Sequence, residues 1–273
     1  VPEGMEPSSA CACMSLLGYD PRVHYRGRGS IEAISMGIPV ADNEVVFRCN
    51  LVSVRDGRMH SYSSGYISND ESHELIQTLN DNLGDDGLSF FPGVSYRHIC
   101  RIAGRMDTLQ SVCTPAHNIP GALIREYLPS GQGSEFLRDL MARSADVLAE
   151  HPVNKAREEK GDAPANMIWL FWGSGQIPSM PSFRDTYGLT GALTSGVDLL
   201  LGLAKMADLR VLEIPGVTGD IYNDYRSQMD GALSALDEVD MIVVHVEAPD
   251  EAGHDGSIED KVESIERIDA DMI

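Results

Sequence analysis

A carboxylate and an imidazole near the end of the chain have the types and spacing of metal ligands. Asp250 and His254 stand in the segment Val246 to Gly256, directly after a β-branched run at Asp240 to Glu247 that predicts a strand. Ligands of parallel α/β sheets bind where strands end, so we expect both side chains in a loop at that edge. There they could clamp a divalent ion such as manganese or zinc. By spacing alone, an acidic turn that merely ends a strand is an equal alternative.

Two hydroxyls and several cations elsewhere could handle an anionic substrate. Ser8 and Ser9 are adjacent near the start; a metal-activated serine would be a nucleophile, and a plain surface turn is the alternative. Guanidinium groups match phosphate and carboxylate oxygens as a bidentate fork. Each candidate cation is, by itself, more typical of a solvated surface group. The candidates are Arg26, Arg28, Arg97, His98 and His117.

The last third of the chain must supply the sheet that positions the acidic segment. Its apolar runs alternate between strand and helix patterns, which predicts a parallel sheet covered on both faces. The expected strands are Met167 to Trp172, Arg210 to Ile214 and Asp240 to Glu247, and the expected helices are Gly191 to Leu209, Asp220 to Leu236 and Ser257 to Met272.

The middle of the chain has a different pattern, which predicts an inserted α+β domain. Val45 to Val54 and Met59 to Ile67 flank Asp56-Gly57, a hairpin turn signal. We then expect a helix at Asn69 to Leu83 capped by Ser68 or Asn69. A strand at Ser95 to Ile102 and helices at Ser134 to Glu150 and Val153 to Lys160 complete the block. The predicted domains are 28–161 for the insertion and 1–27 with 162–273 for the α/β domain, hinged near 161–165.

The composition of the chain excludes several classes of binding partner. A net charge of −21 over 273 residues would repel nucleic acid and anionic membranes, so an anionic substrate would need a locally basic pocket. No apolar run approaches the roughly 20 residues that a bilayer span needs. The five scattered cysteines favour reduced thiols in the cytoplasm. Neither glycine-rich string has phosphate-loop spacing, so no nucleotide is expected. The oligomeric state stays open, a homo-oligomer included.

Several strings together resemble one family, the archaeal-type cofactor-independent phosphoglycerate mutases. Val244 to Gly256 is similar to its metal-binding loop, which typically reads His-Val-x-Ala-x-Asp-Glu-Ala-Gly-His, and Pro2 to Pro21 is similar to its nucleophile loop. The remaining strings follow in family order over nearly the whole chain. They are Tyr25 to Ala33, Phe47 to Val52, Ser95 to His98, Thr114 to His117, Pro181 to Phe183, Tyr187 to Leu189 and Ile214 to Gly219.

The resemblance implies an alkaline-phosphatase-like parallel sheet domain and a phosphoserine mechanism. Ser9 matches the nucleophile, and Ser9, Asp250 and His254 match metal ligands. Two divalent ions are implied (Mn²⁺, with Zn²⁺, Mg²⁺ or Co²⁺ as alternatives), without 2,3-bisphosphoglycerate. A small phosphorylated substrate would meet the five candidate cations, with Arg97-His98 favoured because the family keeps a Tyr-Arg-His string there.

The chain also departs from the family pattern. The usual Gly-Ser-Asp around the nucleophile is Ser8-Ser9-Ala10 here, and Leu201 stands where relatives often have a basic residue, for which Lys205 might substitute. An early Asp-Gly loop and a late Asp-His pair are absent, so we expect a fragment lacking both ends, with weak metal binding and no mutase turnover by itself. A homoserine-kinase-like phosphotransferase, a phosphatase and a non-catalytic remnant are the alternatives.

Overall fold

The computed structural model describes residues 1–5, 7–177 and 179–273, so Glu6, within the predicted nucleophile loop, lies outside the described residues. The chain divides into two compact units. The parallel-sheet unit comprises Val1–Tyr25, Ile34–Gly37 and Pro178–Ile273. The antiparallel-sheet unit comprises Arg26–Ala33 and Ile38–Ile177. A parallel sheet accompanied by an α+β unit confirms the predicted fold class.

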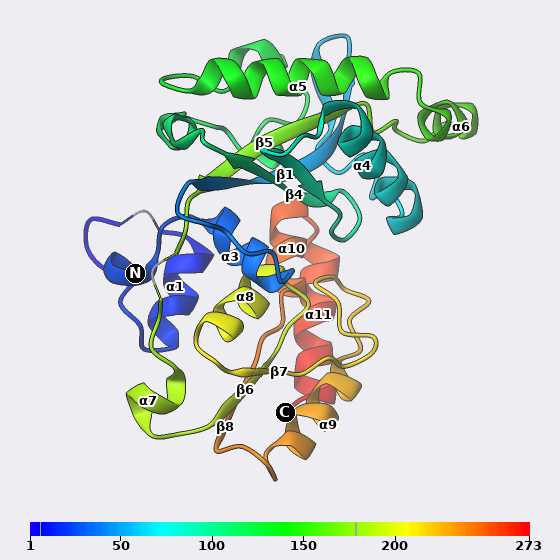
Figure 1. Ribbon diagram of the computed structural model, residues 1–273. Helices are drawn as coiled ribbons and strands as arrows, with labels where there is room; N and C mark the ends of the chain where they lie inside the picture. The colour runs from blue at the N-terminus through cyan, green and yellow to red at the C-terminus, as the bar shows by residue number, and fades with distance from the viewer. Residues whose placement is uncertain (6, 178) are drawn as a thin grey trace. The chain divides into compact units, whose positions relative to one another are not determined.

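Three short parallel strands organise the first unit (Figure 1). The order is β7-β6-β8, with β6 (Gly191–Thr194) between β7 (Arg210–Val211) and β8 (Met241–Val244). Helices α8 (Asp198–Met206) and α9 (Tyr225–Ala235) connect successive strands. The expected single helix from Gly191 to Leu209 is therefore wrong over its first part. The residues of β6 are all buried. Just after this strand, the backbone at Gly196 passes so close to Thr218 that an added Cβ would lie 2.2 Å from the Thr218 carbonyl carbon.

The remaining helices of this unit include the two that carry the predicted chemistry. They are α1 (Ser9–Leu16), α2 (Pro21–His24), α7 (Phe183–Tyr187), α10 (Ala248–Asp255) and α11 (Ile258–Asp271). The helix predicted at Ser257 to Met272 is confirmed as α11. The amino-terminal segment is fastened to α7, since the Tyr187 hydroxyl donates to the carbonyl of Gly18 at 2.6 Å.

The second unit is built on a five-stranded antiparallel sheet. Its strands are β1 (Glu44–Arg55), β2 (Arg58–Ser61), β3 (Leu88–Phe91), β4 (Arg97–Ala103) and β5 (Met167–Ser174). The order is β2-β1-β4-β3, and β5 pairs with β1. The predicted hairpin is confirmed: Asp56 and Gly57 both have positive φ, at 52° and 69°, as a tight primed turn requires.

The strand at Met167 to Trp172 is confirmed as β5, but its predicted place in the parallel sheet is wrong. It runs antiparallel to β1, with Asn50 opposite Trp169 and Val52 opposite Met167. A short apolar run has the same appearance in either kind of sheet, and β1 offered a long apolar partner. Residues 162–177 thus accompany the antiparallel sheet in the contact-based division.

Helices cover this sheet and complete its core. Figure 1 shows α4 (Asn69–Leu83) and α5 (Ser134–Leu148) on one side of the strands. They bury Leu75, Leu79 and Leu140 against sheet residues such as Phe47 and Leu51. The unit also contains most of α3 (Arg28–Ser35), together with α6 (Pro152–Lys160) and short 3₁₀ turns at Met106–Gln110, Ala116–Asn118 and Ile124–Glu126.

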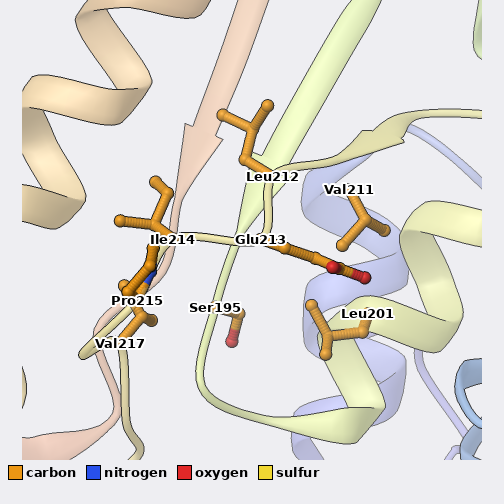
Figure 2. Close-up of a pocket in the computed structure, with 8 residues that line it drawn as sticks. All are labelled: Ser195, Leu201, Val211, Leu212, Glu213, Ile214, Pro215 and Val217. Carbon is orange, nitrogen blue, oxygen red and sulfur yellow. The ribbon is translucent and has the colours of Figure 1, made fainter.

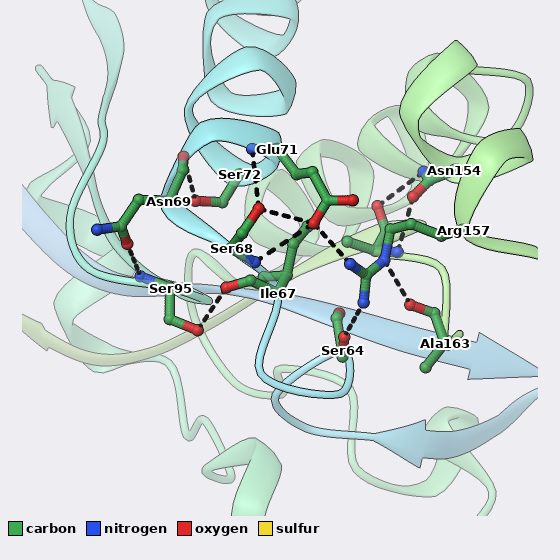
Figure 3. Close-up of polar contacts among 11 residues, drawn as sticks. Ser64, Ile67, Ser68, Asn69, Glu71, Ser72, Ser95, Asn154, Arg157 and Ala163 are labelled. Carbon is green, nitrogen blue, oxygen red and sulfur yellow. Dashed lines mark hydrogen bonds and ion pairs between the residues drawn. The ribbon is translucent and has the colours of Figure 1, made fainter. Parts of the chain in front are cut away.

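One polar network fixes α4 to α6. The Ser68 hydroxyl accepts a hydrogen bond from the Glu71 backbone N–H at 3.3 Å, and the Glu71 carboxylate accepts one from the Ser68 N–H, which forms a capping box (Figure 3). Arg157 then donates to Glu71 at 2.7 Å and to the carbonyls of Ser64 and Ala163. The network explains why α4 begins at the predicted residue.

Across the described residues, no helix combines the length and the apolar character needed to cross a bilayer.

Candidate functional site

The carboxyl ends of the parallel strands bring a serine, a histidine and a glutamate together. Ser195 follows β6 and His245 follows β8, and the Ser195 Oγ lies 3.0 Å from His245 Nδ1. The Ser195 oxygen also accepts from the Val197 N–H at 3.1 Å. The other ring nitrogen lies 3.3 Å from the carboxylate of Glu247. Burial lowers the pKa of His245, against the charge of Asp250, so the ring is held neutral.

The predicted metal ligands Asp250 and His254 lie in α10, so their expected loop position is wrong. Pro249 at the start and Gly256 as the left-handed cap define a helix of two turns. At four residues apart the two side chains share one helix face, and Asp250 Oδ2 lies 3.3 Å from His254 Nε2. Both are largely exposed, at 62% and 71% of the side-chain area.

The donor set of this pair fits a divalent cation in kind. A carboxylate oxygen and an imidazole nitrogen on one face suit manganese or zinc. Within the described ranges, however, no group of three or more His, Cys, Asp and Glu side chains is arranged to hold an ion.

The two candidate nucleophiles have different local roles. Ser8 is the amino-terminal cap of α1, and its hydroxyl accepts from the Cys11 N–H at 3.4 Å. Ser9 is the first residue of α1 and is exposed. Ser9 thus presents its hydroxyl at the positive end of the helix, where a developing anion is favoured. The predicted association of Ser9 with Asp250 and His254 stays a prediction.

A cavity of about 400 Å³ lies beside the same strand ends (Figure 2). Its walls are mostly apolar, and Figure 2 shows the carboxylate of Glu213 extending toward Val211 and Leu201. Lys205, one turn beyond Leu201, donates to the carbonyl of Ser35 at 2.6 Å. The lining residues are Ser195, Leu201, Val211, Leu212, Glu213, Ile214, Pro215 and Val217.

Two arginines of the antiparallel-sheet unit contact one buried carboxylate. Glu32 is 1% exposed and accepts from Arg28 Nε at 2.7 Å and from Arg48 Nη1. Burial opposes ionisation of Glu32, but the charges of Arg48 and Arg28 outweigh it and hold its pKa below the usual value. Arg48 also donates to Asn50 at 2.9 Å. We call Arg28, Glu32, Arg48, Asn50 and Trp172 the Glu32 cluster.

Trp172 joins two predicted substrate ligands to this cluster. The Arg28 guanidinium carbon lies 4.0 Å from the centre of the Trp172 ring, a cation–π contact. The exposed His117 ring lies 5.6 Å from the same indole. The structure therefore brings Arg28 and His117 together through a residue that the sequence analysis did not single out.

The other predicted substrate ligands differ in accessibility. Arg26 is exposed, and Arg97 is half-buried on β4 opposite Asn50. His98 is buried, accepts from the Gly93 N–H through Nδ1, and has its pKa lowered to about 3 by burial. Its ring is neutral and lies on the core side of the sheet, so it cannot act as a cation toward substrate.

Sequence reasoning did not single out Glu32, Arg48 or Trp172, which contact the predicted ligand Arg28 or its partner Glu32. One signal was available: Arg48 and Asn50 alternate with Phe47, Cys49 and Leu51 along β1, which gives that strand one polar face. Glu32 gave no comparable signal, because its partners come from a helix turn and a distant strand.

Known proteins match the whole chain. A family model described as 2,3-bisphosphoglycerate-independent phosphoglycerate mutase matches residues 1–154. Mutases of that name from Methanosarcina barkeri and Methanothrix thermoacetophila are 45% and 47% identical over 273 residues, which is 100% of this chain and 68% of each relative.

Solved structures agree on the fold. A Pyrococcus horikoshii protein matches with a TM-score of 0.71 at 21% identity, over 97% of this chain and 63% of its own. A cofactor-independent phosphoglycerate mutase of Thermoplasma acidophilum matches with a TM-score of 0.55 at 24% identity, over 97% and 71%. With sequence identity carried over its full length, the chain belongs to the 2,3-bisphosphoglycerate-independent phosphoglycerate mutases.

Proposed function

We propose that this protein takes part in the interconversion of 2-phosphoglycerate and 3-phosphoglycerate, without 2,3-bisphosphoglycerate. The observation that carries the proposal is 45–47% identity across all 273 residues to proteins named for that reaction. The Glu32 cluster supports it, since it holds two guanidinium groups, the side chains that match phosphate and carboxylate oxygens, in an otherwise acidic protein.

Ser9 is the proposed nucleophile. Its Oγ–phosphorus bond forms as the bond from phosphorus to the glycerate oxygen breaks, and the hydroxyl proton ends on the released glycerate oxygen. The reverse transfer, to the other hydroxyl of glycerate, regenerates Ser9 and balances the reaction. The exposed position of Ser9 at the start of α1 favours negative charge on and around its oxygen.

Asp250 and His254 would hold a divalent metal together with Ser9, manganese being the first choice. When bound, such an ion would lower the pKa of the serine hydroxyl and neutralise phosphoryl charge. Two ions are proposed, with zinc, magnesium or cobalt as alternatives. The pair supplies an oxygen and a nitrogen from one face of α10.

Arg28, Arg26, Arg97 and His117 are the proposed contacts to the anionic groups of the substrate. Arg28 is the best supported, because its guanidinium is already oriented by Glu32 and Trp172. His98 would act only indirectly, by accepting from the Gly93 backbone beneath β4. A cytoplasmic location remains part of the proposal, on the ground that an odd number of five widely scattered cysteines does not suggest a disulfide framework.

A coupled assay tests the proposal. The protein expressed from its complete reading frame is given 3-phosphoglycerate with Mn²⁺, and formation of 2-phosphoglycerate is followed. A parallel reaction with homoserine and a phosphoryl donor tests the kinase-like alternative. Turnover of 3-phosphoglycerate, abolished in Ser9→Ala, is the expected result; phosphorylation of homoserine alone would reject the mutase assignment.

A further inference from the structure

The Glu32 cluster sets one carboxylate against two guanidinium groups of different exposure. One carboxylate, almost fully buried, faces two guanidinium groups, of which Arg48 has 7% of its side-chain area exposed and Arg28 has 23%. Buried charge is costly unless it is paired, so Glu32 and Arg48 satisfy one another inside the protein. Arg28 is therefore the more solvent-accessible of the two guanidinium groups, and its Nε donates to Glu32.

Two glycines allow the helix that carries Arg28 to approach the sheet. An added Cβ on Gly29 would lie 2.5 Å from the carbonyl oxygen of Trp172 and 2.9 Å from that of Val46. One on Gly27 would lie 2.5 Å from the Ser174 Cβ. Ser30 locks the contact, because its N–H donates to the Ser174 hydroxyl at 2.6 Å. The start of α3 is therefore held rigidly against the end of β5.

The backbone of Trp172 is in an unfavourable conformation. Its φ is 52°, a region that bulky side chains rarely occupy, and it lies where the pairing of β5 with β1 shifts register between Val46 and Arg48. Such irregularities re-aim a side chain, and strain of this kind gathers at functional positions. Here the indole is turned against Arg28, at 4.0 Å from the ring centre.

We propose that Glu32 and Trp172 are positioning residues that fix the Arg28 guanidinium for an oxyanion of the substrate. Glu32 accepts from the Nε of the Arg28 guanidinium, and the Trp172 ring packs against the guanidinium. The orientation of the remaining N–H groups of Arg28 is therefore fixed before the substrate binds. Less side-chain entropy is then lost when the anion arrives. The inference rests on the proposed mutase function for the identity of the anion, a phosphoglycerate.

Calorimetric titration with 3-phosphoglycerate tests the role of Glu32. Removing a negative charge beside two cations should tighten anion binding if charge alone matters. If Glu32 positions Arg28, Glu32→Gln weakens binding by about tenfold despite the added positive charge, and makes binding more sensitive to salt. Glu71→Gln is the matched control, because Glu71 also pairs with a buried arginine in the same unit (Figure 3). Tighter or unchanged binding in Glu32→Gln overturns the proposal.

Trp172 is tested by a graded series. Trp172→Phe keeps a ring and should weaken binding by a few fold, whereas Trp172→Leu should weaken it by about tenfold or more. Equal affinities in both variants and the wild type would overturn the role of the ring. In Trp169→Phe, Trp172 is the one tryptophan left of the chain's two, and its emission should change on titration with 3-phosphoglycerate.

The outcomes separate this inference from the proposed function. Titrations with inorganic phosphate and with D-glycerate show which end of the substrate loses affinity in Trp172→Leu; no loss with either ligand overturns the inference. A wild-type protein that does not bind 3-phosphoglycerate also overturns it. Weakened binding in the variants together with an inactive mutase assay would reject the proposed reaction and retain the positioning roles.

Discussion

Ser195 and His245 meet at 3.0 Å between Oγ and Nδ1, although one follows β6 and the other follows β8. The contact ties two neighbouring strands at the edge where ligands of parallel sheets bind. Gln228 strengthens the tie by donating to the carbonyl of His245 at 3.1 Å. The loop that leads into α10 is thus anchored before the chain reaches Asp250, which gives the predicted metal pair a fixed base.

Substitution of Asp250 or His254 should remove metal affinity. Asp250→Asn and His254→Gln each delete one donor of the pair, and we expect Mn²⁺ affinity of the complete protein to fall at least tenfold in either variant. Asp255→Asn is the control, since it removes a similar exposed carboxylate at the end of the same helix. Titration followed by the electron paramagnetic resonance of free Mn²⁺ gives the affinities. An equal loss in Asp250→Asn and Asp255→Asn would indicate a charge effect only.

Substitutions of the two adjacent serines should have different effects, one on the stability of the protein and the other on its mutase activity. Ser8→Ala removes the amino-terminal cap of α1 and should lower the free energy of unfolding by about 1 kcal/mol. Ser9→Ala removes an exposed hydroxyl outside the capping bond and should change stability by less than about 0.5 kcal/mol. Only Ser9→Ala should abolish mutase turnover. Urea unfolding and the coupled assay are measured on both; turnover by Ser9→Ala would exclude it as nucleophile.

Local turn and cap chemistry made much of the fold predictable. The Asp56-Gly57 turn and the Ser68 cap placed β1 and α4 almost to the residue, whereas β2 ends at Ser61, short of the predicted Ile67. Short buried strands were harder to predict from the sequence. The four residues of β6 are all buried, and their apolar pattern cannot be separated from that of the helix that follows. The place of β5 depends on pairing with a strand far away in the chain, which no local pattern specifies.

Local spacing also decided which residues of the candidate site the sequence could propose. Asp250 and His254 could be proposed because their spacing is local, and the same spacing also suits one face of a helix, the form that α10 takes. The Glu32 cluster could not, because its geometry arises from a helix docked on a register shift in β5. The buried position of His98 follows from strand alternation, since it lies opposite Cys49 on the core side.

Gly29 should tolerate no side chain. Its added Cβ would lie 2.5 Å and 2.9 Å from two backbone carbonyl oxygens, and backbone cannot move aside as a flexible side chain can. Gly29→Ala should therefore cost about 1–3 kcal/mol of unfolding free energy and also weaken binding of 3-phosphoglycerate, because α3 would be displaced. Gly87→Ala is the control in the same unit, with its nearest contact at 3.5 Å and no positive φ. Equal stability of the two variants would contradict the close docking of α3.

Acid should destabilise the antiparallel-sheet unit through His98. Burial lowers its pKa from 6.5 to about 3, so between these values the unfolded chain binds a proton that the folded chain does not. Stability is therefore complete above pH 6.5 and is lost as the pH falls toward 3, at up to about 1.4 kcal/mol per pH unit. His98→Gln keeps an acceptor for the Gly93 N–H without the titrating ring, so the decline in unfolding free energy between pH 6.5 and 5 should be shallower than in the wild type. His60→Gln, which alters an exposed histidine on β2, should leave that decline unchanged. Identical profiles of unfolding free energy against pH for the wild type and His98→Gln would show that protonation of His98 does not destabilise the folded protein.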